Sequence, residues 1–449
     1  MASSSEASRL SEASYYDSWR FFKNVLAPTL MKGVIKRRPW VEAAAQYLGL
    51  DTNAVRFLQE MRKKYGSGPL LVNLLFRSQV VTLDPKDVMQ VLEGTPIPFG
   101  QATKEKKSAL NHFEPGNVLI SDPERRKVLR PVHEHALATN ERVHPLAERF
   151  NHVINEELDL LLRAMDDKSD VELNWDRVSE TWFRVIRRIS LGDAAREDHQ
   201  LTEDMGAIRG RGNWGFLASS DKSTLESVQR RLTDYLNDPE EGSLISRFPK
   251  GHGAASELEL PSQIGQWLFA WDAAGIIMAR ALALLGCQPD EQRKAAEEAK
   301  TAAANGSDRP FSRAVYLDAI RLWPTTPIIL RDLMEDATVG GRTVTKGTGV
   351  MIFAPFFHRD DQHLEAAHRM STDRWMDKEV EPSTALVPFS AGPAMCPGHN
   401  LVPMVAGLFI AGLLSRATLA LHWPKLDPES LPGTLDHTEV KLRISKQIS

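Results

Sequence analysis

One cysteine in the sequence has neighbours that could make it a metal ligand. Cys396 stands in residues 389–398, FSAGPAMCPG, directly before the apolar stretch Leu401 to Leu414. A ligating thiolate needs a depressed pKa, which backbone N–H groups at a helix N-terminus favour. Gly392 and Gly398 would let the backbone approach a flat ligand, and Phe389 could keep water off the sulfur. Such a turn could offer one thiolate to a heme iron and leave its opposite face free. The alternative is a buried cysteine before a core helix.

Two upstream segments favour the metal-ligand interpretation. Residues 318–324 read DAIRLWP and residues 367–375 read AHRMSTDRW, and Arg321 lies 75 residues before Cys396. Residues 389–398 have the pattern Phe-x-x-Gly-x-x-x-Cys-x-Gly. In their order and spacing, the three segments resemble the K-helix, the meander and the heme-binding loop of the cytochrome P450 family. The resemblance covers roughly Tyr65 to the C-terminus. It implies a mainly α fold with small β-sheets, in which heme b (iron protoporphyrin IX) lies between a long central helix and the loop of the cysteine ligand.

The resemblance also implies roles for charged residues. Arg126 and Arg130 stand where the family has residues that reach a heme propionate, and Arg331 stands where an arginine of an extended segment does the same. Arginine suits a carboxylate because its planar fork can bind both oxygens. Ala394 departs from the pattern, since an Arg or His that binds a propionate is usual there, so the three arginines must hold the propionates.

A second set of residues is expected to form a buried ion network beneath the heme: Asp318, Arg321 and Arg374. Asp318 replaces the usual glutamate, which shortens the side chain by one methylene and keeps the charge.

The long central helix departs from the family where protons must be delivered. Aligned through Pro289, the family's acid matches Asp272 and its threonine matches Ala273, so the acid is present and the hydroxyl is missing. Asp272 is the candidate general acid, acting through water. Trp267, Phe269 and Trp271 lie nearby and would wall the distal pocket, or belong to the core as aromatic residues of buried helices usually do.

The function implied by the resemblance is monooxygenation. A heme-thiolate enzyme would insert one oxygen atom from O2 into a mostly apolar small molecule, in secondary metabolism or catabolism. No flavin or nicotinamide module is visible, so the electrons would come from separate proteins, with a ferredoxin and its reductase as the expected pair. Ala273 keeps open a peroxygenase or a rearranging enzyme that needs no reductive O2 activation. A non-catalytic heme sensor is the third alternative.

Composition sets wider limits. The 449 residues are 42% hydrophobic, enough for a large core, and the net charge of −4 argues against a nucleic-acid binder. Two cysteines give no disulfide framework, which fits a reducing compartment and a cytoplasmic location. We expect no transmembrane segment, because charged or polar residues interrupt both long apolar stretches. Trp19 to Arg38 mixes aromatic and basic residues, so weak membrane contact remains an alternative to packing on the body.

The elements that must position these residues can be read from local signals. Asp84-Pro85 and Asp122-Pro123 each begin a helix, with aspartate as the N-cap. Leu258 to Gly286 is the long central helix, and two prolines make residues 324–331 extended. Leu70–Phe76 and Gln79–Leu83 predict a hairpin, and Val339–Ile352 predicts a small sheet. Met205 to Gly251 indicates a lid with glycine hinges. We expect a single domain over residues 1–449, with residues 1–40 as an N-terminal extension and surface helix.

Overall fold

The computed structural model describes residues 10–74, 77–165, 172–249, 257–301, 308–376 and 384–446. The described chain is mainly helical, as predicted, and its α-helices are α1 (Tyr15–Phe21), α2 (Ala27–Lys32), α3 (Pro39–Tyr47), α4 (Leu50–Tyr65), α5 (Pro85–Glu93), α6 (Lys104–Leu110), α7 (Pro123–Ala136), α8 (Ala147–Arg163), α9 (Trp175–Leu191), α10 (His199–Gly212), α11 (Lys222–Asn237), α13 (Leu260–Gly286), α14 (Pro289–Thr301), α15 (Pro310–Leu322), α16 (Ala354–His358) and α17 (Leu401–Leu414).

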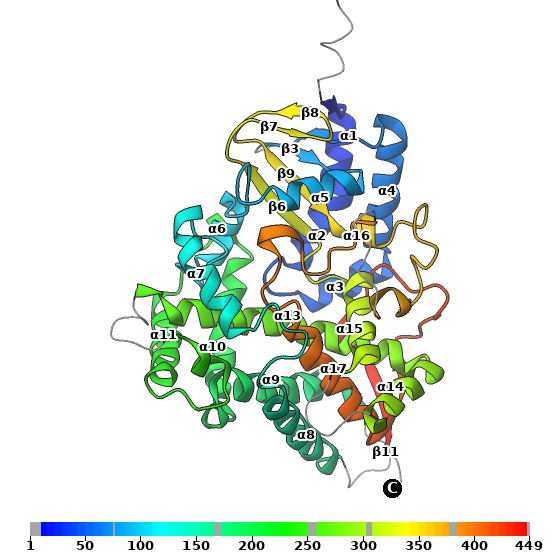
Figure 1. Cartoon of the computed structure of the whole chain (residues 1–449). Helices are drawn as coiled ribbons and strands as arrows, with labels where there is room; N and C mark the ends of the chain where they lie inside the picture. Colours follow the sequence, from blue (N-terminus) through cyan, green and yellow to red (C-terminus); the bar gives the residue numbers. More distant parts are fainter. Residues whose placement is uncertain are drawn as a thin grey trace, which may run out of the picture.

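Within the described residues, three small sheets accompany the helices. Their strands are β1 (Ser11–Glu12), β2 (Leu70–Asn73), β3 (Ser78–Val81), β4 (Phe99–Gly100), β5 (Glu172–Asn174), β6 (Ile328–Leu333), β7 (Ala337–Val339), β8 (Arg342–Val344), β9 (Gly349–Phe353), β10 (Ala417–Trp423) and β11 (Lys441–Lys446). The largest sheet has the order β1-β2-β3-β9-β6-β4, and the others are β10-β11-β5 and β7-β8. In Figure 1 the largest sheet lies with α1, α4 and α5 at one end of the molecule, and α8, α9, α14 and α17 lie toward the other.

Most local predictions are confirmed. β2 and β3 form the predicted antiparallel hairpin, although Leu75 and Phe76 lie outside the described residues. Asp122 caps α7 by accepting the Arg125 N–H at 2.9 Å, and Asp84 caps α5. The extended segment after the prolines becomes β6, which carries Arg331 opposite Val350 of β9.

The prediction of glycine hinges is corrected in part. Gly206, Gly210 and Gly212 belong to α10, whereas Gly215 and Gly242 lie outside the α-helices with φ of +46° and +84°. Gly251 lies outside the described residues, and the lid stays a prediction. Packing explains the glycine at position 212 of α10, because a Cβ there would lie 2.9 Å from the carbonyl oxygen of Ala109 in α6. The glycine therefore permits a close helix contact at a cost in helix propensity.

Helix α13 crosses the middle of the molecule (Figure 1) and is 27 residues long. Within the described residues it is the one helix long and apolar enough to span a membrane, and 78% of its most apolar window is buried inside the molecule. Its burial against α9, α15 and the C-terminal sheet explains its apolar composition without a membrane.

The N-terminal segment packs on the body and also exposes apolar side chains. Asp17 is 1% exposed and binds Lys64 of α4 at 2.6 Å, while Arg20 binds Glu60. Other side chains face solvent, namely Tyr15, Tyr16, Trp19, Leu30, Met31 and Trp40, with Trp214 and Leu217 after α10. Arg38 of the N-terminal segment lies 5.0 Å from the Trp214 ring centroid, so the exposed Trp214 lies beside this segment. The membrane contact and the single domain stay predictions.

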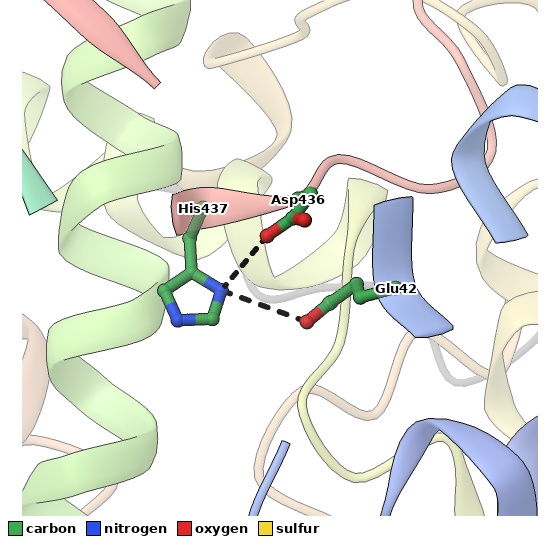
Figure 2. Close-up of side chains that lie close together, drawn as sticks. All are labelled: Glu42, Asp436 and His437. Carbon is green, nitrogen blue, oxygen red and sulfur yellow. Dashed lines mark ion pairs between the residues drawn. The ribbon is translucent and has the colours of Figure 1, made fainter. Parts of the chain in front are cut away.

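Glu42, Asp436 and His437 form a buried charge cluster (Figure 2), which Arg280 connects to the central helix. Arg280 of α13 binds Glu42 of α3 at 2.5 Å, and His437 Nδ1 lies 3.6 Å from Glu42 and 3.9 Å from Asp436. Carboxylate and imidazole atoms at these distances are also typical of metal sites. We assign the cluster a structural role, because Arg280 already neutralises Glu42 and a metal cation would lie beside that guanidinium.

Candidate functional site

The Cys396 loop lies directly before a buried helix. The Cys396 N–H donates to the carbonyl oxygen of Phe389 at 2.9 Å, which closes the turn. Residues 388–397 all keep accessible surface, whereas α17 is almost entirely buried. The loop is therefore rigid at its base and open on one side. The Phe389 ring packs against the core, and its role as a shield of the sulfur stays a prediction.

The backbone conformation and the close packing at position 392 require glycine. Its φ is +65°, and a Cβ there would lie 2.3 Å from the carbonyl oxygen of Leu92 at the end of α5. The close approach seen at Gly392 is to the backbone of α5, and the approach of Gly392 and Gly398 to a flat ligand stays a prediction. Gly398 acts differently, because a Cβ there would meet only ordinary contacts, 3.8 Å from Cys396 Sγ and 3.4 Å from Val402.

The expected lowering of the Cys396 pKa is wrong for this chain without a bound metal. Burial raises the pKa of the Cys396 thiol. The Gly398 N–H and the positive charge of Arg130 lower this pKa, but by less than burial raises it. The helix N-terminus acts in the predicted direction and is outweighed by desolvation. The thiol would therefore lose its proton when a metal binds and supplies the missing positive charge.

The other cysteine is a poor ligand candidate. Cys287 ends α13 and donates to the carbonyl oxygen of Leu284 at 3.2 Å, as a buried thiol with no metal partner does. Burial raises its pKa to about 11.

One of the three predicted propionate arginines contacts the loop, and a second lies near the first. Arg126 of α7 donates to the carbonyl oxygen of Pro393 at 3.0 Å and is 7% exposed. Arg331 of β6 is 3% exposed and donates to Thr95 Oγ1 at 3.0 Å. Burial, and then the charge of Arg126, lower the pKa of Arg331 to about 10, so the two guanidinium groups are neighbours and both stay charged at neutral pH.

Arg130 is placed differently from those two. Its Nε binds Glu134 of the same helix at 2.6 Å, so its charge is already balanced. Its field still reaches Cys396 and lowers the pKa of that thiol. A contact between Arg130 and a propionate stays a prediction.

The predicted ion network of Asp318 and Arg321 forms, but its third member is not Arg374. Asp318 and Arg321 of α15 are both fully buried and bind each other at 2.5 Å, and Arg321 also donates to the carbonyl oxygens of His358, Ala367 and Arg369. Asp318 accepts the indole N–H of Trp375 at 2.8 Å, whereas Arg374 donates to Ser371 Oγ. Trp375 therefore completes the network at the place expected for Arg374.

Asp272 is paired with a base on a neighbouring helix. Its Oδ2 lies 3.5 Å from Nη1 of Arg209 in α10, and its side chain is 22% exposed. Ala273 follows it on α13, so no hydroxyl stands at the next position. The structure tests neither residue as a catalytic group.

The aromatic residues of α13 point in different directions. Trp271 packs edge-on against Trp182 of α9, and Trp267 donates to His133 Nδ1 of α7 at 2.9 Å. These two are buried core residues, as one of the two alternatives predicted. Phe269 contacts Phe113 edge-on with ring centroids 5.4 Å apart, so it lies toward the segment between α6 and α7.

Two cations were not predicted. Arg209 meets Asp272, and Lys106 of α6 donates to the carbonyl oxygen of Leu330, next to Arg331, at 3.4 Å. Arg209 stands in the glycine-rich stretch and Lys106 in a run of lysines, so neither residue type was distinctive in its local sequence.

The residues present fit a heme. Among the described residues no carboxylate pairs with Arg126 or Arg331, although both are buried cations and Arg126 contacts the thiol loop. Buried cations need anions, and the two heme carboxylates would supply them. Cys396 would be the iron ligand in the same place.

Comparison with known proteins agrees with this geometry. Residues 271–437 match the family model described as Cytochrome P450. The chain is 30% identical over 186 residues to mouse cytochrome P450 4V2, covering 38% of this chain and 35% of that protein. It is 29% identical over 171 residues to drimenol monooxygenase of Persicaria hydropiper, covering 35% and 33%.

A third relative is steroid 17-alpha-hydroxylase/17,20 lyase of Rana dybowskii, 28% identical over 170 residues, with 35% of this chain and 32% of that protein covered. The chain thus spans about a third of the length of the curated relatives it matches. The matched region carries Asp272, Arg331 and Cys396. Over this region the chain is similar to cytochromes P450, a family whose cofactor is heme.

Proposed function

We propose that the chain is a heme-thiolate monooxygenase that inserts one oxygen atom from O2 into a mostly apolar small organic molecule. The observation that carries the proposal is a pair of neighbouring buried cations, Arg126 and Arg331, without a carboxylate partner in the described chain. Arg126 contacts the loop of Cys396 at Pro393. A thiolate-ligated heme supplies cleavage of the O–O bond, because the sulfur donates electron density toward the iron.

The residues of the chain would serve that chemistry in separate ways. Gly398 and Arg130 stabilise the anionic sulfur of Cys396, Arg126 and Arg331 bind the carboxylates, and Gly392 holds the loop against α5. The pair Asp318 and Arg321 fixes α15 beneath the loop. Two of the relatives carry names that describe oxygenation, of drimenol and of a steroid. These names support an apolar substrate without identifying it.

The first prediction concerns the ligand. Reduced protein with carbon monoxide should show the strongly red-shifted band of thiolate-ligated heme, and Cys396→Ser should lose that band, because an alcohol is a poor substitute for a thiolate. Cys287→Ser is the matched control and should keep it. The proposal fails if Cys287→Ser loses the band while Cys396→Ser keeps it.

Ala273 favours a second candidate function. Without a hydroxyl to hold water beside Asp272, the protein could use peroxide or rearrange its substrate without reductive O2 activation. NAD(P)H consumption in step with product, in the presence of electron-transfer proteins, separates the two: monooxygenation requires it, and the alternative proceeds without it.

The electron donors and the location are also proposals. A ferredoxin with its reductase is the proposed pair of electron donors. The relatives come from a mouse, a plant and a frog, so a single reductase is the alternative donor with which the pair should be compared. Exposed aromatic side chains such as Trp19 and Trp214 support weak membrane contact over a purely cytoplasmic location. Reconstituting turnover with each donor, with and without lipid vesicles, tests both proposals.

A further inference from the structure

We propose that Lys106 is a further heme-binding residue, whose ammonium pairs with a heme carboxylate and supplies the charge that Ala394 lacks. The proposal rests on the proposed function. Ala394 stands at the end of the turn that holds Gly392, and its methyl group offers no charge to a carboxylate.

The geometry brings Lys106 to Arg331. Lys106 Nζ donates to the carbonyl oxygen of Leu330 at 3.4 Å, and Arg331 Nη1 donates to the same oxygen at 2.9 Å. Two donors on one oxygen lie no more than about 6 Å apart, within the range of strong charge interaction. Lys106 comes from α6 and Arg331 from β6, so two separate elements place like charges side by side.

The carboxylates near this pair are occupied. Asp332 binds Arg77 at 2.5 Å, and Glu105 lies 3.3 Å from the same guanidinium. In the described part of the chain no carboxylate pairs with Lys106, Arg126 or Arg331. Three neighbouring cations without a counterion repel one another, and a molecule with two carboxylates would neutralise most of that charge.

The ionisation of Lys106 agrees with a missing anion. Burial, and then the charge of Arg331, lower the pKa of Lys106 to about 7, against the opposing charge of Asp332. A carboxylate partner favours the charged form and would raise this pKa again. Heme binding near neutral pH should therefore draw a proton onto Lys106.

The test compares heme loss from the holoprotein. Lys106→Met keeps the length of an apolar stem and removes the charge, and Lys107→Met, at an exposed position of the same helix, is the control. Transfer of heme to an excess of a heme-scavenging protein should be about tenfold faster from Lys106→Met, the size expected for a lost charged hydrogen bond. Lys106→Arg should restore slow loss.

A second readout separates binding of heme from stability. The reduction potential of the heme in Lys106→Met should become more negative, because a positive charge near the cofactor is removed, whereas Lys107→Met should leave it unchanged. The difference between wild type and Lys106→Met in protons taken up on heme binding should be largest near pH 7 to 8.

The outcomes distinguish this proposal from the proposed function. A normal thiolate band with carbon monoxide in both variants, but equal heme loss and equal potential, overturns the role of Lys106 alone. A wild-type protein that takes up no heme overturns both proposals together.

Discussion

At the residue scale, the pair of Asp272 and Arg209 decides what the central helix can do. Asp272 Oδ2 lies 3.5 Å from Arg209 Nη1, and that nitrogen has no hydrogen-bond partner among the described atoms. The carboxylate is thus held by charge without a close hydrogen bond, which leaves its oxygens free for water. With Ala273 next to it, we infer that Asp272 delivers protons through ordered water.

The prediction for this residue is kinetic. Asp272→Asn should slow reductive turnover about 10²-fold, the size typical of losing a general acid, and should spare substrate binding. Ala273→Thr should leave turnover intact or improve its coupling to electron input, measured as product per NAD(P)H. Unchanged reductive turnover in Asp272→Asn would remove this residue from the mechanism and favour substrate-assisted or peroxide chemistry.

At the element scale, one ion pair connects α3 with α13. Glu42 is 2% exposed, and burial tends to raise its pKa, but Arg280 and His437 together bring the pKa below the ordinary value. Arg280 also donates to the carbonyl oxygens of Leu435 and Trp323. The pair therefore anchors the N-terminal helices, the central helix and the C-terminal segment to one another.

Breaking this pair should destabilise the protein. Glu42→Gln keeps the shape of the side chain but leaves Arg280 as a buried charge without an anion, which should reduce the free energy of unfolding by about 3 kcal/mol or more. Denaturant unfolding measures the change. Asp290→Asn, in the exposed ion pair with Arg293, is the control and should change stability by less than about 0.5 kcal/mol. Equal stability of Glu42→Gln and wild type would refute the anchoring role.

At the scale of the whole molecule, buried histidines make stability depend on pH. Burial lowers the pKa of His133 and His144 to about 4 and that of His358 to about 3. The folded protein keeps all three neutral, whereas the unfolded chain protonates them near pH 6.5. Unfolding therefore takes up protons below pH 6.5, so stability must fall as the pH falls from there toward 4.

The expected change is measurable. At pH 5.5, one unit below the ordinary histidine pKa, each buried histidine should lower the free energy of unfolding by about 1.4 kcal/mol relative to its value at pH 7.5. Denaturant titrations across this range test it, with His152→Gln, at an exposed position, as a control that leaves the slope unchanged. A flat profile between pH 7 and pH 5 would contradict the burial of these rings as neutral groups.

The sequence by itself determined the features that depend on local chemistry. Cys396 between glycines before an apolar stretch predicts the ligand loop, Asp122 before a proline predicts a capped helix, and the prolines at 324 and 327 predict the strand of Arg331. Caps, turns and extended segments are fixed by neighbours a few residues away, so they can be read from spacing alone.

The tertiary structure alone decided which distant groups meet. Lys106 and Leu330 are 224 residues apart, and Asp272 meets Arg209 only because α10 packs near α13. The same packing turns Trp267 and Trp271 toward α7 and α9, and it desolvates the Cys396 thiol enough to raise its pKa. Pairings and desolvation depend on which surfaces come together, and no local spacing in the sequence specifies them.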